Sequence, residues 1–117
     1  MAAPNIVNVA TITGKTAVQA VGTSATAIVT NSASSGKVFK VNALLISNVD
    51  GTDNADITVD LYRSSTAYHL AKTVVVPADA TLDVLAKAIY LEEGDALRLT
   101  ANAASDLEAI CSYEEIS

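Results

Sequence analysis

The chain has 117 residues, half of them hydrophobic and only 4% aromatic, and its formal net charge is −6. One domain of this length buries a core of its own without disulfides or metals, and here Val, Ile, Leu and Ala must supply that core. The negative charge and the scatter of the seven basic residues argue against a nucleic-acid binder or a protein that binds anionic membranes, because both need clustered Lys and Arg.

Residues typical of β-strands are frequent along the chain, and turn-forming clusters interrupt them at intervals of about ten residues. This pattern predicts an all-β protein: an antiparallel β-sandwich of jelly-roll type with about seven to nine strands, in one domain over residues 1–117. The expected strands span residues 5–12, 15–22, 26–31, 37–49, 56–63, 68–76, 87–91, 96–101 and 107–116. Residues 77–87 could form a short helical turn, but a loop followed by a strand is favoured.

Residues 1–14 have two interpretations of equal weight. Small residues and Pro4 suit an extended arm that reaches a neighbouring subunit, and the run that follows could add to the edge of that subunit's sheet. The same run could instead be the first strand of its own sandwich. The interface candidates on this segment are Ile6, Val7, Val9 and Ile12.

Three of the expected strands alternate between apolar and polar residues, as strands with one dry and one wet face do. They are residues 56–63, 96–101 and 107–116. Cys111 falls on the apolar side of the last one, which predicts a small buried side chain without a reactive thiol. Because it is the chain's only cysteine, no intrachain disulfide or thiolate metal cage can form.

The segment "DGTDNAD" contains Asp50, Asp53 and Asp56 around Gly51 and Asn54. Hard cations bind several oxygens from such loops, but the spacing is not that of an EF-hand. Asp, Gly and Asn are also the residues that make tight turns. We therefore expect a solvated turn between two strands, with a weak calcium site as the alternative.

The sequence offers little for an enzyme. Glu92, Glu93 and Asp95 could form a carboxylate pair for acid–base chemistry, but a charged hairpin tip is the favoured interpretation, since no other polar group is tied to them in sequence. His69 is the only histidine and therefore the only candidate base of a catalytic triad. It lies in a predicted strand with no nucleophile elbow elsewhere, so we expect a surface histidine. No cofactor is expected.

Nothing in the sequence points to secretion or to a membrane. The N-terminal residues lack the basic segment and long apolar run of a secretory signal, and the apolar runs are too short to span a bilayer. The expectation is a protein made in a cytoplasm.

The segments "VFKVNALLISNVDGTDNADITVDLYR", "AKTVVVPADATLDVL" and "IYLEEGDALRLTANAASDLEAICSYEEIS" occur in this order. Together they resemble small virion structural proteins of tailed bacteriophages, especially those that infect cyanobacteria and other marine bacteria. The resemblance covers roughly residues 37–117. No single segment is specific, and the order of the segments carries the resemblance.

The resemblance implies a component of the virion without enzymatic activity. A capsid decoration (cement) protein is the first choice, with the major capsid protein or other virion proteins as partners. Such proteins often form trimers, and the small apolar residues of the first third of the chain also favour a homo-oligomer. A tail, neck or baseplate component is the alternative in the same class. A carbohydrate- or cation-binding β-sandwich module is the alternative from another class, and the absence of Trp weakens its carbohydrate form.

Overall fold

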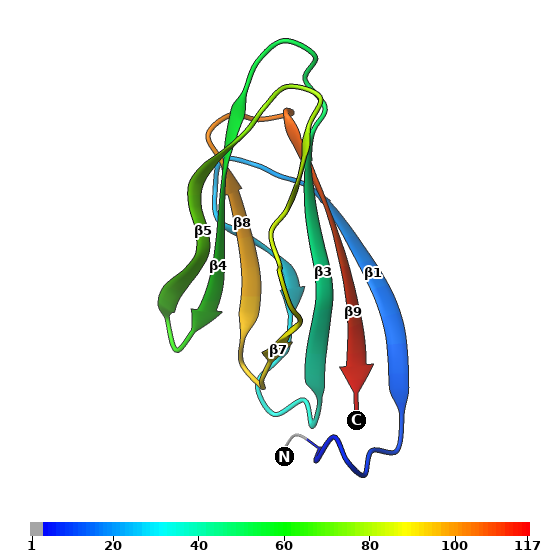
Figure 1. Ribbon diagram of the computed structural model, residues 1–117. Helices are drawn as coiled ribbons and strands as arrows, with labels where there is room; N and C mark the ends of the chain where they lie inside the picture. The colour runs from blue at the N-terminus through cyan, green and yellow to red at the C-terminus, as the bar shows by residue number, and fades with distance from the viewer. Residues whose placement is uncertain (1–3) are drawn as a thin grey trace.

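The computed structural model describes residues 4–117, which form nine strands and no helix. Sheet A contains, in order, β1 (Ile12–Ala20), β9 (Leu107–Ile116), β3 (Val38–Asn48) and β6 (Thr81–Asp83), and β7 (Ile89–Leu91) also pairs with β3. Sheet B contains, in order, β2 (Thr26–Thr30), β8 (Ala96–Ala101), β4 (Ala55–Arg63) and β5 (Thr66–Val76). The two sheets enclose the core between them (Figure 1). The predicted antiparallel β-sandwich is confirmed.

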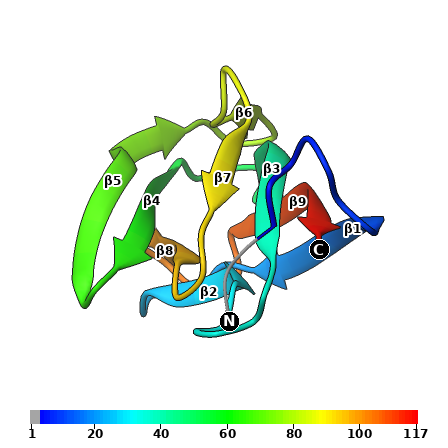
Figure 2. The same cartoon turned by 90° about the horizontal axis from the view of Figure 1, so that it is seen from below.

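The strands pair in a nested series. The first strand pairs with the last, β2 with β8, β3 with β6 and β7, and β4 with β5, every pair antiparallel. The chain is thus one long hairpin that turns back at Ser64 and Ser65, whose φ angles are 50° and 61°. The hairpin closes on itself because β9 also pairs with β3 and β8 with β4 (Figure 2).

The strand predicted over residues 5–12 is wrong, whereas the strand predicted over residues 15–22 is present but begins at Ile12 and ends at Ala20. Residues 5–11 lie outside both sheets, and a single strand, β1, runs through the predicted turn at Gly14 and Lys15. Each of the nine residues of β1 has a partner on β9 without a register shift, so the ladder overrides the local turn signal. Residues 1–3, the beginning of the predicted arm, lie outside the described residues.

The ambiguous segment 77–87 contains no helix. It forms a turn and the short strand β6, which pairs with β3 at Leu45–Ser47. The favoured prediction of a loop followed by a strand is confirmed. None of the residues 4–117 belongs to a helix that is long and apolar enough to cross a membrane.

A bulge in β3 decides which of its side chains enter the core. The register with β9 shifts between Val41 and Ala43. Val41 before the bulge and Leu44 after it are both fully buried. They are three residues apart, and in a regular strand this spacing would place them on opposite faces. One extra residue reverses the alternation of a strand. Leu45 therefore lies on the outer face of sheet A, with 36% of its surface exposed.

Because the bulge places Leu44 in the core and Leu45 on the outer face, we predict that their substitution by alanine affects the free energy of unfolding differently. Leu44→Ala leaves a cavity in the core and lowers the free energy of unfolding by about 3 kcal/mol. Leu45→Ala removes a surface side chain and lowers it by about 0.5 kcal/mol or less. Urea unfolding of both variants measures the difference, and equal losses would contradict the placement of the bulge.

Candidate functional site

The segment of residues 4–11, with three of the four N-terminal interface candidates, lies at the end of the sandwich where β1 begins and β9 ends (Figure 1). Ile6, Val7 and Ile12 expose 51%, 90% and 55% of their surface, and Val9 is half-buried. The N–H of Val7 donates to Asn5 Oδ1 at 3.0 Å. Ile12 starts β1, whereas the other three lie in the segment outside the sheets. Three of the four candidates therefore present apolar surface to solvent.

The hydrogen bonds of this segment divide it into two parts. The N–H groups of Ala10 and Thr11 both donate to the carbonyl of Ser117 at 2.9 Å. The N–H of Asn8 donates to the carbonyl of Asn5, so the bonds of residues 4–9 close a local turn. The last two residues before β1 are therefore anchored to the C-terminus, whereas residues 4–9 have no such bonds to it.

A second apolar surface lies on the outer face of sheet A. Val18, Ile110 and Leu45 occupy one row across β1, β9 and β3, and Val18 is 74% exposed. Val18 and Ile110 of this row line an open groove of about 380 Å³, together with Ser47 and Glu108. The sequence analysis missed this surface. Its only signal was that Ile110 falls among polar residues on the wet side of β9.

The loop between β3 and β4 uses Asp50 for its own structure. Asp50 Oδ1 accepts hydrogen bonds from the N–H of Thr52 at 2.8 Å, from its hydroxyl at 2.9 Å and from the N–H of Asp53 at 3.2 Å. These bonds, the one from the Thr52 N–H above all, lower the pKa of the Asp50 carboxyl. Asp56 lies at the start of β4, where its N–H donates to Asn102 Oδ1.

The three aspartates do not converge on a common point. Within residues 4–117 no three His, Cys, Asp or Glu side chains come together as a metal site would require. The arrangement is that of an Asx-type turn, in which a carboxylate accepts main-chain N–H groups two and three residues ahead. The preference for a turn over a calcium site stays a prediction, with this geometry in its favour.

Sequence reasoning missed the carboxyl group that faces this loop. Asp106, in the β8–β9 loop, is joined to it because the N–H of Val49 donates to the Asp106 carbonyl at 2.8 Å. Loss of hydration, together with the nearby charge of Asp50, raises the pKa of the Asp106 carboxyl. No short-range signal links the two residues, because they are more than 50 positions apart in the sequence.

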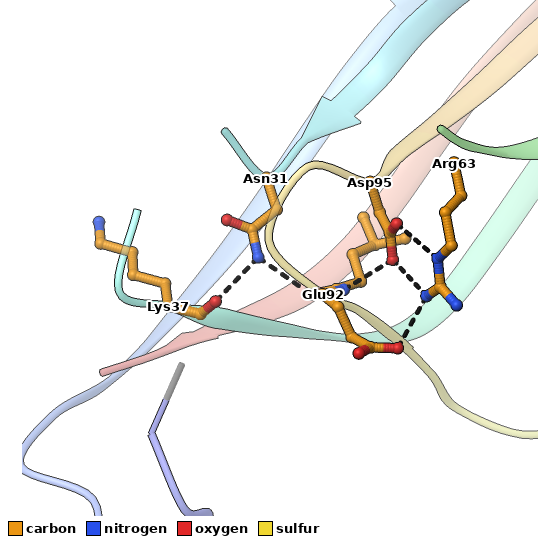
Figure 3. Close-up of polar contacts among 6 residues, drawn as sticks. Asn31, Lys37, Arg63, Glu92 and Asp95 are labelled. Atoms are coloured by element: carbon orange, nitrogen blue, oxygen red, sulfur yellow. Dashed lines mark hydrogen bonds and ion pairs between the residues drawn. The ribbon is translucent and has the colours of Figure 1, made fainter. Parts of the chain in front are cut away.

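The second acidic turn is tied to other parts of the fold (Figure 3). Arg63, at the end of β4, donates from Nε to Asp95 Oδ1 at 2.8 Å and from an η nitrogen to Asp95 Oδ2 at 2.6 Å. It also reaches Glu92 Oε2 at 2.8 Å. The expectation of a charged tip without polar partners is wrong, because the partners come from distant strands.

Asn31 joins the same turn to the β2–β3 loop. Its side-chain amide donates to the carbonyls of Lys37 at 2.9 Å and Leu91 at 3.0 Å (Figure 3), and its Oδ1 accepts from the Ser35 hydroxyl at 2.6 Å. Its main-chain groups bond Gly94 and Asp95. Asn31 is fully buried and well supplied with hydrogen bonds, as a buried amide requires. The cluster is therefore a structural clamp at this end of the sandwich.

The Asp95 carboxyl is nearly buried, with 2% of its side chain exposed. Burial alone would raise its pKa, but the hydrogen bonds from Arg63 and the Glu92 N–H and the charge of Arg63 outweigh it, so the pKa is lowered. Asp95 is therefore held ionised. It is unsuited to acid–base work, which needs a pKa near the working pH.

The remaining candidates of the sequence analysis lie apart from these clusters. His69 is exposed on β5, opposite Asp60 in the register. Asp60 pairs with Arg98 at 2.9 Å, and the Arg98 guanidinium lies 3.8 Å from the centre of the Tyr62 ring. Cys111 is fully buried, as predicted, and burial raises the pKa of its thiol to about 11. A thiol with this pKa is not a nucleophile at neutral pH.

Comparisons with known proteins give likenesses of fold only. No family model matches the chain, and no curated protein matches it. A chain of the disulfide-linked pili that form Bacillus endospore appendages is similar over 92% of this chain and 88% of its own, with a TM-score of 0.53 and 15% identity. A chain of the acid-stable capsid of Helicobacter pylori bacteriophage KHP30 is similar over 94% and 90%, with a TM-score of 0.52 and 7% identity.

A pentameric capsid protein from metagenomic phage sequences is also similar, at 20% identity. Its TM-score is 0.45, and the match covers 86% of this chain and 62% of that protein. At these identities the likenesses describe the arrangement of strands.

We predict that Arg63→Ala lowers the free energy of unfolding by about 2 kcal/mol, because it leaves the buried Asp95 carboxylate without its partner; solvent at the half-exposed arginine limits the loss. Since the folded-state pKa of Asp95 lies below its usual value, the contribution is present at neutral pH and fades as the pH falls through the acid range. Melting curves from pH 7 down to pH 3 measure this. Lys72→Ala, on the exposed face of β5, is the control. If the difference in melting temperature between wild type and Arg63→Ala grew as the pH fell, the account would be contradicted.

We predict that Asp106→Asn raises the melting temperature at neutral pH. The raised pKa of Asp106 means that its ionisation beside Asp50 works against folding, so the penalty grows as the pH rises and vanishes where Asp106 is protonated. The gain over wild type should therefore shrink as the pH falls toward 3. Glu108→Gln removes one negative charge elsewhere and is the control. A melting temperature that drops at pH 7 would show that the two carboxyl groups do not repel.

Proposed function

We propose that this chain is a non-enzymatic structural protein of a bacteriophage virion, and that it decorates and stabilises the head. The proposal rests on the strand arrangement, on the extent of the fold likeness and on the apolar surface that the chain leaves exposed. The resemblance of residues 37–117 to small phage virion proteins points in the same direction.

The strand arrangement supports a particle protein. If β6 and β7 are counted as one interrupted strand, the nested pairs give eight strands in two sheets of four. We infer that this is a jelly roll, the double Greek key found in viral capsid and lectin domains. Jelly rolls also host other functions, so the arrangement by itself is only a first support.

The observation that carries the proposal is the extent of the likeness to the bacteriophage KHP30 capsid chain. The match covers 94% of this chain and 90% of the other, so the likeness extends over nearly the full length of both chains. The pilus chain matches almost as completely, and it too is part of an assembly of repeated subunits. A small β-sandwich that serves in an ordered assembly is therefore the common feature.

The proposed partners are the major capsid protein or other virion proteins, with further copies of this chain. Residues 4–9 supply the contact, because Ile6 and Val7 are exposed apolar side chains on a segment outside the sheets. Such a segment can extend onto a neighbour without disturbing its own sandwich. The resemblance to small phage virion proteins implies a homotrimer, whereas a contact through the free edge of β1 would give pairs of copies; the proposed site of action is the virion.

We predict that deletion of residues 1–9 abolishes binding to particles that lack the protein while the fold survives, because Ala10 and Thr11 keep their bonds to Ser117. The double variant Ile6→Ser, Val7→Ser should show the same loss without shortening the chain. Val49→Ser, which removes an exposed valine near the acidic loop, is the matched control. Co-sedimentation with particles measures binding, and circular dichroism confirms folding.

Unchanged binding of the truncated chain would overturn the assignment of the contact to residues 4–9. Localisation of the full-length chain in a map of the particle tests the role itself. A position on the tail, neck or baseplate would replace the decoration role by the alternative within the same class.

A further inference from the structure

The four edges of the two sheets differ in how well they are protected from pairing with another chain. On sheet A, one end is formed by β6 and β7, which have three residues each. On sheet B, β2 is short and carries a bulge, and the register of β5 with β4 shifts twice. Short strands and bulges are the usual devices that prevent edge-to-edge association.

The fourth edge, β1, is neither short nor bulged. It runs for nine residues without a register shift and contains no proline. In the hydrogen-bonded order β1 ends sheet A (Figure 1). Strand β2 of sheet B contacts β1 near its end, where the side-chain amide of Gln19 donates to the Ala27 carbonyl at 3.0 Å. A long, regular edge strand is a template for a further strand.

The hydrogen bonds beside β1 show which of its main-chain groups face outward. Thr11 and Ser117 exchange two bonds, each N–H donating to the other's carbonyl at 2.9 Å. In an antiparallel ladder such pairs recur at every second residue, so odd-numbered residues of β1 bond to β9. The even-numbered residues direct their N–H and C=O groups to the free edge, and residues 4–117 supply no main-chain partner to them. They are Ile12, Gly14, Thr16, Val18 and Ala20.

The charges of the chain also favour this edge for self-association. All thirteen acidic residues lie at or beyond Asp50, so β1 contains none of them. Its only charged residue is Lys15, whose Nζ lies 3.2 Å from Glu115 of the same chain. Two copies with a net charge of −6 each repel least where the facing strands carry no uncompensated charge.

We propose that β1 pairs with β1 of a second copy, antiparallel, about a two-fold axis at Thr16. This register uses all five outward residues of both strands, with Ile12 opposite Ala20, Gly14 opposite Val18 and Thr16 opposite itself. It joins the two copies of sheet A into one continuous sheet. The same register is the only symmetric one that leaves no residue of β1 without a partner.

The side chains fit this register. On the outer face, Val18 of one copy lies beside Gly14 of the other, where the absence of a side chain leaves open space. On the inner face, Lys15 lies beside Ala17, so no two lysines face each other. In the joined sheet, the exposed row of Val18, Ile110 and Leu45 of one copy and the same row of the second copy lie on the same face.

Disulfide trapping tests the register directly. The Cα atoms of two residues opposite each other in a hydrogen-bonded pair are about 5.5 Å apart, which a disulfide spans. We expect Thr16→Cys to give a disulfide-linked dimer under mild oxidation. Ile12→Cys is the matched control, because it has the same outward orientation but lies about 27 Å from its symmetry mate. Cys111 is buried and does not take part.

A proline test needs no cross-link. Thr16→Pro removes one outward N–H and none of the β1–β9 bonds, as proline on an edge strand allows, whereas Thr16→Ala keeps the N–H. We expect the wild type and Thr16→Ala to show a doubling of the 12.0 kDa chain mass in sedimentation at micromolar concentration, and Thr16→Pro to sediment as a monomer. If Thr16→Pro does not fold, the comparison of cross-linking by Thr16→Cys and Ile12→Cys tests the proposal by itself.

Several results would overturn the proposal. They are a monomeric wild type, cross-linking of Ile12→Cys as efficient as that of Thr16→Cys, and a trimeric mass that Thr16→Pro leaves unchanged. Loss of self-association on deletion of residues 1–9 would assign the contact to that segment instead. All of these measurements use the isolated protein, so the outcome is independent of the virion role.

Discussion

The pairing of β3 with β9 is the constraint on which the rest of the structure depends. It joins a strand from the first half of the chain to the last strand, from Val38 opposite Ile116 to Asn48 opposite Leu107. On its other side β3 holds β6 and β7, and β9 holds β1. Sheet A therefore exists only when this long-range ladder has formed, and such non-local pairing makes folding slow.

The nested order of strands has a consequence at each end of the sandwich. The outermost pair, β1 with β9, leaves β1 with no strand beyond it, so the free edge follows from the topology. The ladder ends at Ser117, so residues 4–9 have no strand to pair with and bond only within a local turn. At and beyond the ends of β2, β4 and β7, where the ladders stop, side-chain hydrogen bonds of Asn31, Arg63 and Asp95 hold the loops together.

The sequence predicted what depends on local patterns. Alternation placed Val59 and Leu99 in the core, and turn chemistry separated most of the strands. It did not predict features that need a partner far along the chain. The strand break at Gly14 was wrong because β9 continues past it, and the bulge after Val41 is visible only against β9. The polar partners of Asp95 come from distant strands, so residue spacing near the turn gave no sign of them.

Residue-resolved amide hydrogen exchange at low protein concentration tests the account most directly. The account predicts alternation along β1, with slow exchange at residues bonded to β9, such as Lys15 and Ala17, and fast exchange at outward residues, such as Thr16 and Val18. Raising the concentration should slow the outward amides selectively. Uniform exchange along β1, fast or slow, would contradict both the register with β9 and the free edge.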